Sequence, residues 1–134
     1  MIVPFLCFHG QCEEAVRFYA KVFGFESRFL YFHQVPQRGF EVPESFNGKV
    51  MFTEFMIADQ HVMATDHIPG LPTQPGQSVT LNIIHTGKAD IESWFAQLSE
   101  GGLVGMPLQK TGWAPWYGSL TDRYGIVWQF SLNA

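Results

Sequence analysis

The hydrophobic pattern of the first residues predicts a strand followed by an amphipathic helix. Residues 2–8 form an apolar run of strand length. Residues 11–23 then show helical spacing, with Glu13 and Glu14 in the first turn and Gly24 as the stop. The apolar stripe of this helix consists of Ala15, Val16, Phe18, Tyr19 and Val22.

The rest of the first half predicts three more strands. Residues 25–33 read as a strand, and residues 34–47, with two prolines and a glycine, as a loop. Residues 49–58 and 61–65 predict a hairpin that turns at Ala58-Asp59-Gln60. Residues 66–76 hold three prolines and two glycines, which indicates a connector.

The second half repeats this order of elements. A strand is predicted at 78–85 and a helix at 88–99, ended by Gly101-Gly102. The remaining strands are expected at 103–109, 116–121 and 126–132, with a tight turn at 122–125. The helical stripe consists of Ile91, Trp94, Phe95 and Leu98. The pattern predicts two tandem βαβββ modules, at about 1–68 and 76–134, within a single domain of residues 1–134.

Composition limits the possible partners. Hydrophobic residues make up 46% and charged residues 15% of the chain, so a homo-oligomer or a large apolar cavity would absorb the surplus apolar surface. The net charge of -4, with eight Lys and Arg spread thinly, argues against nucleic-acid binding. No apolar stretch reaches the roughly 18–20 residues that span a bilayer. The first residues lack signal-peptide features, so we expect a cytoplasmic protein. Cys7 and Cys12 are predicted to be buried thiols.

Three stretches carry a family resemblance. They are EEAVRFYAKVFG at 13–24, GKVMFTEFMIADQHVMATD at 48–66 and GWAPWYGSLTDRYGIVWQF at 112–130. Together they resemble the PhnB-like branch of the vicinal oxygen chelate superfamily, which includes glyoxalase I, bleomycin-binding proteins and extradiol dioxygenases. The resemblance implies an α+β fold in which two βαβββ modules form a curved, partly open mixed β-barrel. It also implies a homodimer with a small-molecule ligand in each cavity.

Some members of this branch carry a label as a ubiquinone-pathway methyltransferase. This sequence has no glycine-rich turn between a strand and a helix that could hold a nucleotide-like donor. It also lacks the long alternation of strands and helices that such enzymes show. We therefore do not expect methyl transfer.

Strand alternation predicts which side chains face the cavity, because successive side chains point to opposite faces. The apolar set Val79, Leu81 and Ile83 fits the helix side, so Thr80 and Asn82 should face the cavity. The same reasoning places Pro4, Leu6 and Phe8 toward the cavity. It also places Glu54 on one face of its strand with Phe52 and Met56, and Gln129 on one face of the last strand with Val127 and Ser131. The side chains at 54, 80, 82 and 129 should therefore converge on a shared cavity. Trp128 should pack on a helix.

The resemblance also carries over four metal-binding positions. Metal-using members hold a divalent ion with His and Glu from four strands, and the corresponding positions here are Pro4, Glu54, about Ser78–Thr80 and Gln129. Glu54 alone is a charged ligand, and Pro4 has no side-chain donor. We therefore predict no metal ion and no cofactor. The five histidines form no ligand motif and are interpreted as scattered surface or strand-end residues.

Glu54 has two interpretations. A carboxylate in an apolar cavity would have its pKa raised by desolvation, which suits a general acid or base. Alternatively, a neighbouring arginine, a hydroxyl or the open mouth of the barrel satisfies it.

The aromatic residues after Gly112 also have two interpretations. Trp113, Trp116 and Tyr117 could form a lip that stacks on a planar ligand. They could instead pack across a dimer or close the end of the barrel.

Three functions follow from these readings. The first is a homodimeric protein that binds a small molecule through Phe8, Phe52, Thr80, Asn82, Trp113, Trp116, Tyr117 and Gln129. The second is a lyase, isomerase or dioxygenase that uses Glu54 with a non-standard metal site or by metal-free acid–base chemistry. The third is an interaction protein whose cavity is filled by its own side chains.

Overall fold

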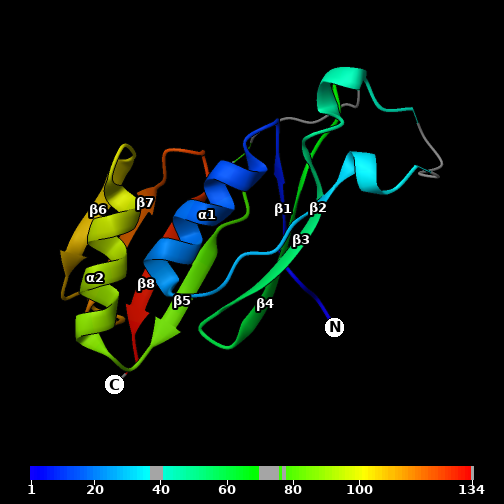
Figure 1. Ribbon diagram of the computed structural model, residues 1–134. Helices are drawn as coiled ribbons and strands as arrows, with labels where there is room; N and C mark the ends of the chain where they lie inside the picture. The colour runs from blue at the N-terminus through cyan, green and yellow to red at the C-terminus, as the bar shows by residue number, and fades with distance from the viewer. Residues whose placement is uncertain (37–40, 70–75, 77, 134) are drawn as a thin grey trace. The chain divides into compact units, whose positions relative to one another are not determined.

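The structure, a computed structural model, describes residues 1–36, 41–69, 76 and 78–133. The chain divides into two compact units, Met1–Thr73 and Gln74–Ala134. Each unit contains one long helix and a four-stranded sheet, with strand orders β1-β4-β3-β2 and β5-β8-β7-β6 (Figure 1). The α+β fold of two βαβββ modules is therefore confirmed, and the sheets are not closed by strand pairing in the described ranges. That the chain forms one domain stays a prediction.

The first unit begins with a strand and a helix and ends with a hairpin. Its elements are β1 (Phe5–Phe8), α1 (Cys12–Phe23), β2 (Leu30–Tyr31), the 3₁₀ turns η1 (Phe32–Gln34) and η2 (Glu44–Phe46), β3 (Val50–Ile57) and β4 (Gln60–Asp66). The predicted hairpin is confirmed: Ala58 and Asp59 have φ of 48° and 65°, as a two-residue turn that matches the strand twist requires. β2 is much shorter than predicted: it pairs with β3 at Leu30 and Tyr31 in an irregular register. Before it, the Thr53 hydroxyl donates to the Arg28 carbonyl.

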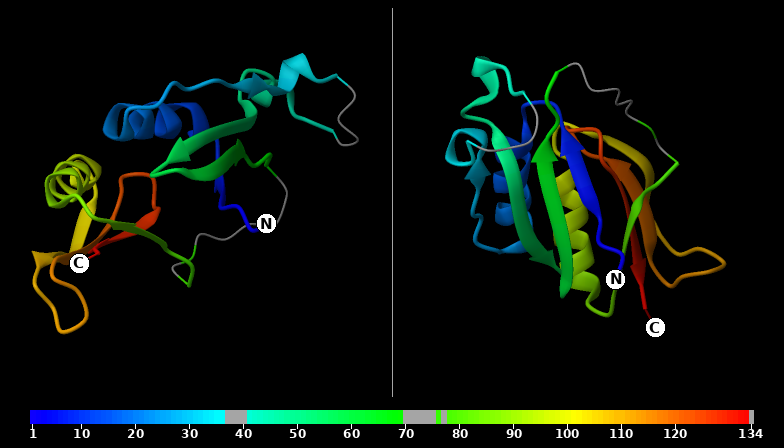
Figure 2. Two further views of the ribbon diagram at one scale, coloured as in Figure 1. Left: turned by 90° about the horizontal axis from the view of Figure 1, so that it is seen from below. Right: turned by 90° about the vertical axis from the view of Figure 1, so that its right-hand side faces the viewer.

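Helix α1 covers one face of the first sheet, where it packs against β3 and β4 (Figure 2). Its buried residues are Cys12, Ala15, Val16, Tyr19 and Val22. Gly24 ends the helix with φ of 78°, and its N–H donates to the carbonyl of Ala20 at 2.8 Å. The helix and its C-terminal glycine agree with the sequence pattern.

The face predicted for β1 is wrong. Leu6 and Phe8 are 8% and 3% exposed, and the Phe8 ring lies 6.5 Å from that of Tyr19 on α1. Phe5 and Cys7 are exposed on the opposite face. The run at residues 2–8 is apolar on both sides, so it offers no alternation that could fix the phase of the strand.

The second unit follows its predicted elements closely. They are β5 (Leu81–His85), α2 (Lys88–Ser99), β6 (Leu103–Gln109), β7 (Tyr117–Thr121) and β8 (Val127–Leu132). Helix α2 buries Ile91, Phe95 and Leu98 and crosses one face of its sheet (Figure 2). Trp128 is 1% exposed, and its indole N–H donates to the Asp122 carboxylate at 2.9 Å. Its predicted core position is confirmed.

Asp66 lies at the end of β4, although the sequence pattern assigned it to the connector. Asp66 is 2% exposed, and its carboxylate accepts three backbone N–H bonds, from Gly10 at 2.8 Å, Cys12 at 2.9 Å and Val50 at 3.0 Å. Asp66 thus joins β4 to the β1–α1 turn and to the start of β3. Residues 70–75 and 77 of the predicted connector lie outside the described ranges.

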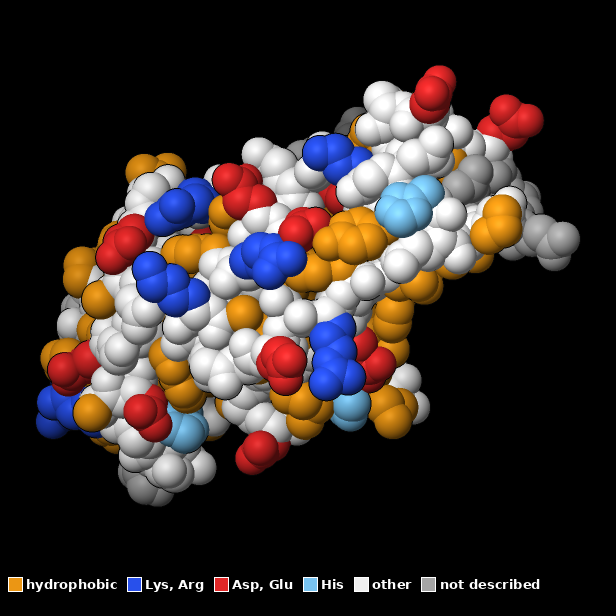
Figure 3. All heavy atoms as spheres, in the orientation of Figure 1, with side chains coloured by type: hydrophobic (Ala, Val, Ile, Leu, Met, Phe, Trp, Pro, Cys, Tyr) orange, Lys and Arg blue, Asp and Glu red, His pale blue; other side chains and the backbone are white. Residues whose placement is uncertain are grey.

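The two cysteines differ in exposure. Cys12 is buried as predicted, whereas Cys7 is exposed, so that prediction was wrong for Cys7. Acidic and basic side chains are interspersed on the face seen in Figure 3. None of the described helices is long and apolar enough to cross a membrane.

Candidate functional site

The face of the second sheet that α2 leaves uncovered carries a hydrogen-bonded polar network. Gln129 Nε2 donates to Thr80 Oγ1 at 2.6 Å, and the Tyr117 hydroxyl donates to Gln129 Oε1. Beside them, Ser131 Oγ donates to Asn82 Oδ1 at 3.1 Å. Thr80, Asn82 and Gln129 therefore share one face, as strand alternation predicts.

The network leaves hydrogen-bonding capacity for a further group. Both carboxamide ends of Gln129 are engaged, but its Nε2 carries a second N–H. Within the described residues, the Nδ2 of exposed Asn82 has no hydrogen-bond partner. This face can thus donate N–H bonds to a carbonyl or hydroxyl oxygen, while its own side chains are held in place.

The two tryptophans after Gly112 differ in their surroundings. Trp113 is 69% exposed and meets Tyr117 edge-on, with ring centroids 5.4 Å apart. Trp116 is half-buried, and the Lys88 ammonium lies 4.2 Å from its ring centroid. Its buried Nε1 has no hydrogen-bond partner among the described residues. Trp113 is therefore the exposed ring beside the polar network.

Glu54 lies on the face of the first sheet opposite α1, together with Phe52 and Met56 as predicted. Its Oε1 is 2.6 Å from His61 Nδ1, and the two side chains are 41% and 51% exposed. Within its unit, Glu54 is thus neither isolated nor enclosed in an apolar cavity. The hairpin register pairs Glu54 with Met63 and Met56 with His61, so residue 61 is a diagonal neighbour of residue 54 on one face. That register could have revealed the pair.

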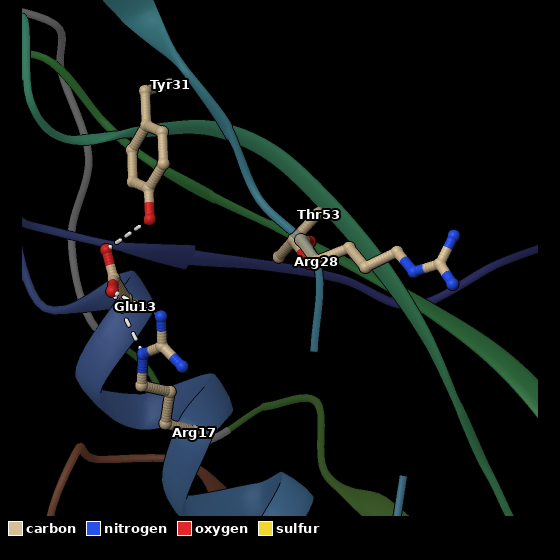
Figure 4. Close-up of polar contacts among 5 residues, drawn as sticks. All are labelled: Glu13, Arg17, Arg28, Tyr31 and Thr53. Atoms are coloured by element: carbon tan, nitrogen blue, oxygen red, sulfur yellow. Dashed lines mark hydrogen bonds and ion pairs between the residues drawn. The ribbon is translucent and has the colours of Figure 1, made fainter. Parts of the chain in front are cut away.

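A recess of about 300 Å³ adjoins Glu54 and was not predicted from the sequence. Its lining residues are Arg28, Phe29, Leu30, Phe52, Thr53 and Glu54. Thr53 Oγ1 donates to the Arg28 carbonyl at 2.6 Å, which ties the segment before β2 to β3 (Figure 4). Phe52 also approaches Phe5 of β1, with ring centroids 6.3 Å apart. Phe8 lies on the other side of this sheet, against α1.

A second recess, of about 420 Å³, lies between α1 and the start of β3. Glu13 lines it and accepts bonds from the Tyr31 hydroxyl at 2.8 Å and from Arg17 Nε at 2.9 Å (Figure 4). Partial burial alone would raise the pKa of Glu13, but the bonds from Tyr31 and Arg17 outweigh it, so the pKa is lowered. Lys49 Nζ donates to the Gly10 carbonyl at 3.1 Å. Because these groups satisfy one another, we assign this recess a structural role.

The four positions taken over from metal-using proteins do not fit a divalent ion. Gln129 Oε1, the atom that would bind a metal ion, accepts a hydrogen bond from the Tyr117 hydroxyl. Glu54 pairs with His61, and Pro4 offers no side-chain donor. In the described part of the chain, no group of three or more His, Cys, Asp or Glu side chains could hold a metal ion.

The first strand–helix turn does not fit a nucleotide-like donor. The amides of Gly10 and Cys12, at the start of α1, already donate to the Asp66 carboxylate. Helix-start amides of this kind are the groups that would otherwise bind an anionic ligand.

Two βαβββ units of this topology define a glyoxalase-like α+β protein. The fold matches a glyoxylase/bleomycin resistance protein/dioxygenase domain from Frankia sp. EAN1pec, with a TM-score of 0.66 at 13% identity over 100% of this chain and 97% of that one. The chain belongs to the PhnB-like family, whose model, described as 3-demethylubiquinone-9 3-methyltransferase, matches residues 1–131.

Two solved structures are closer in sequence. Protein PA1353 from Pseudomonas aeruginosa is 32% identical over 99% of this chain and 97% of its own, with a TM-score of 0.87. A putative 3-demethylubiquinone-9 3-methyltransferase, the PhnB protein from Bacillus cereus, is 25% identical over 98% of both chains, with a TM-score of 0.72.

Proposed function

We propose that the protein binds a small molecule on the uncovered face of its second sheet, without a metal ion at the positions that metal-using members of the superfamily employ. The observation that carries this proposal is the network of Tyr117, Gln129 and Thr80. The side chains are neutral, partly exposed and fixed by one another.

A fixed polar network next to an exposed aromatic ring is typical of small-molecule sites. Because the side chains are already ordered, a ligand loses less affinity to their immobilisation. Asn82 and Gln129 offer N–H donors, and Trp113 offers a flat apolar surface. The ligand therefore combines a planar or apolar part with a carbonyl or hydroxyl oxygen.

The same proposal includes a homodimer. In the second unit, β6 is an edge strand of its sheet, and its neighbouring residues Leu103 and Val104 are 76% and 47% exposed. An edge strand with exposed apolar side chains can pair with a strand of another chain, and most soluble oligomers are built from copies of one chain.

Methyl transfer is disfavoured, although the description of the family model names it. The strand–helix turn that would hold a nucleotide-like donor has its amides occupied by Asp66.

Acid–base catalysis that uses Glu54 together with its partner His61 is the second candidate function, and one observation favours it. Glu54 contacts the imidazole of His61 at Nδ1. The other ring nitrogen, Nε2, is therefore the atom that could exchange a proton with a substrate. A lyase or isomerase reaction could use such a pair without a metal. In that case Glu54→Gln would abolish any turnover while leaving the protein folded.

A ligand screen tests the binding function. Neutral planar compounds with an oxygen acceptor are screened for a rise in melting temperature, and the affinities of those that raise it are measured. Asn82→Ala and Tyr117→Phe should each weaken binding about tenfold, the size expected for one hydrogen bond. Glu92→Ala, an exposed change on α2, is the control and should leave the affinity unchanged. Equal affinity in all variants would contradict the proposed site.

A further inference from the structure

We propose that the recess beside β2 and β3 in the first unit binds the carboxylate of an apolar monocarboxylic acid, with Arg28 as the anchoring cation. This inference rests on the proposed function, because it names a class of small molecule for a protein that we propose to be a small-molecule binder. It concerns different residues from the network in the second unit.

The backbone of Arg28 is fixed at the rim of the recess. Thr53, which is 2% exposed, donates its hydroxyl to the Arg28 carbonyl at 2.6 Å. Arg28 precedes β2, so this bond attaches an irregular segment to the long strand β3. In Figure 4 the Arg28 side chain extends away from Thr53 and away from the Glu13–Arg17 pair.

The Arg28 guanidinium keeps most of its hydrogen-bonding capacity. Its side chain is 84% exposed, and its ion-pair contact in the described part of the chain is with Glu26 at 4.0 Å, which is weak at such exposure. Arg17 differs, because it binds Glu13 at 2.8 Å and lies over the Phe29 ring at 5.0 Å. A guanidinium fork matches the two oxygens of a carboxylate. Arg28 is thus available to a ligand anion.

The other walls of the recess select the rest of the ligand. Phe29, Leu30 and Phe52 supply apolar surface, and Leu30 is 38% exposed. Glu54 lines the same recess, and its Oε1 pairs with His61. Its negative charge repels a second carboxylate, so a single anionic group is directed toward Arg28. The volume of about 300 Å³ is at the small end of ligand pockets. The ligand class is a small apolar acid with one carboxylate.

Calorimetric titration of the full chain with 3-phenylpropionate and with its neutral amide, 3-phenylpropionamide, tests this site. Arg28→Gln should weaken binding of the acid about tenfold, as expected for a lost charge-assisted bond. The amide should bind more weakly than the acid, with the same affinity in both proteins. Lys21→Gln removes one positive charge from an exposed position of α1 and should leave both affinities unchanged. Added salt should weaken binding of the acid to the wild type.

Several results would overturn the proposal. The wild type could fail to bind 3-phenylpropionate, or Arg28→Gln could bind it with the same affinity as the wild type. Arg28→Gln could also lose as much affinity for the amide as for the acid. Inorganic phosphate that binds as tightly, with the same dependence on Arg28, would show a general anion site in place of a carboxylate site. Tyr117→Phe distinguishes the two proposals. If neutral ligands bind more weakly to Tyr117→Phe than to the wild type, the proposed function holds even when Arg28→Gln has no effect on binding of the acid.

Discussion

Glu54 Oε1 lies 2.6 Å from His61 Nδ1 on the face of the first sheet opposite α1. The contact joins β3 to β4 across the hairpin and orients the imidazole. A carboxylate beside Nδ1 favours the tautomer with its proton on that nitrogen.

The tautomer of His61 is therefore the first prediction. Neutral His61 should carry its proton on Nδ1 in the wild type, and Glu54→Gln should reduce that population. Long-range ¹H–¹⁵N correlation spectra of the imidazole rings measure it, with His61→Gln used to assign the signals. A ring protonated on Nε2 in the wild type would show that the pair does not form in solution.

Removal of the Asp66 carboxylate should destabilise the protein strongly. Asp66→Ala leaves the N–H groups of Gly10, Cys12 and Val50 without their acceptor. We expect a loss of about 3 kcal/mol in the free energy of unfolding, measured with urea. Glu41→Ala, an exposed change in the same unit, should cost less than about 0.5 kcal/mol. A similarly small loss for Asp66→Ala would refute the structural role of this carboxylate.

The two cysteines should differ in reactivity. Cys12 is fully buried, and burial, followed by the charge of Asp66, raises the pKa of its thiol far above the usual value. Partial burial also raises the pKa of the Cys7 thiol, but Cys7 is exposed and therefore accessible to a reagent. A disulfide reagent should thus label one thiol in the folded protein and two in urea. Cys7→Ser should abolish labelling of the folded protein, and persistent labelling would contradict the burial of Cys12.

The bond between Tyr31 and Glu13 should give a defined pH dependence. The pKa of Glu13 is lowered in the folded state, so the stabilisation is present above the unfolded pKa of about 4.3 and is lost as the pH falls below it. Tyr31→Phe removes one of the hydrogen bonds that lower the pKa of Glu13. The stability difference between wild type and Tyr31→Phe should therefore be present at neutral pH and shrink as the pH falls below about 4.3. Urea unfolding at several pH values measures it, and a difference that grows in acid would contradict the assignment.

Much of the fold could be predicted from the sequence where local chemistry is decisive. The β3–β4 hairpin follows from a short polar turn between alternating segments. β6 has the predicted bounds, residues 103–109. In β5, the alternation of Asn82 with buried Ile83 set the correct face. Each of these features depends on neighbouring residues.

The features that could not be predicted depend on contacts between distant residues. The phase of β1 is set by packing of Phe8 on Tyr19, because the strand is apolar on both faces. The partner of Glu54 follows from the register of the hairpin, and the position of Arg28 from a side-chain bond to its backbone. Thr80, Asn82 and Gln129 lie in the second unit and Glu54 in the first, so their convergence on one cavity stays a prediction.

The side-chain amide signals of Asn82 and Gln129 offer the most direct check on the binding site. A ¹H–¹⁵N spectrum is recorded while a neutral ligand that raises the melting temperature is added, and again with zinc alone. Both signals should move with the ligand and stay in place with zinc. Signals that do not shift with the ligand, or that shift with zinc, would contradict metal-free binding of a small molecule on this face of the second sheet.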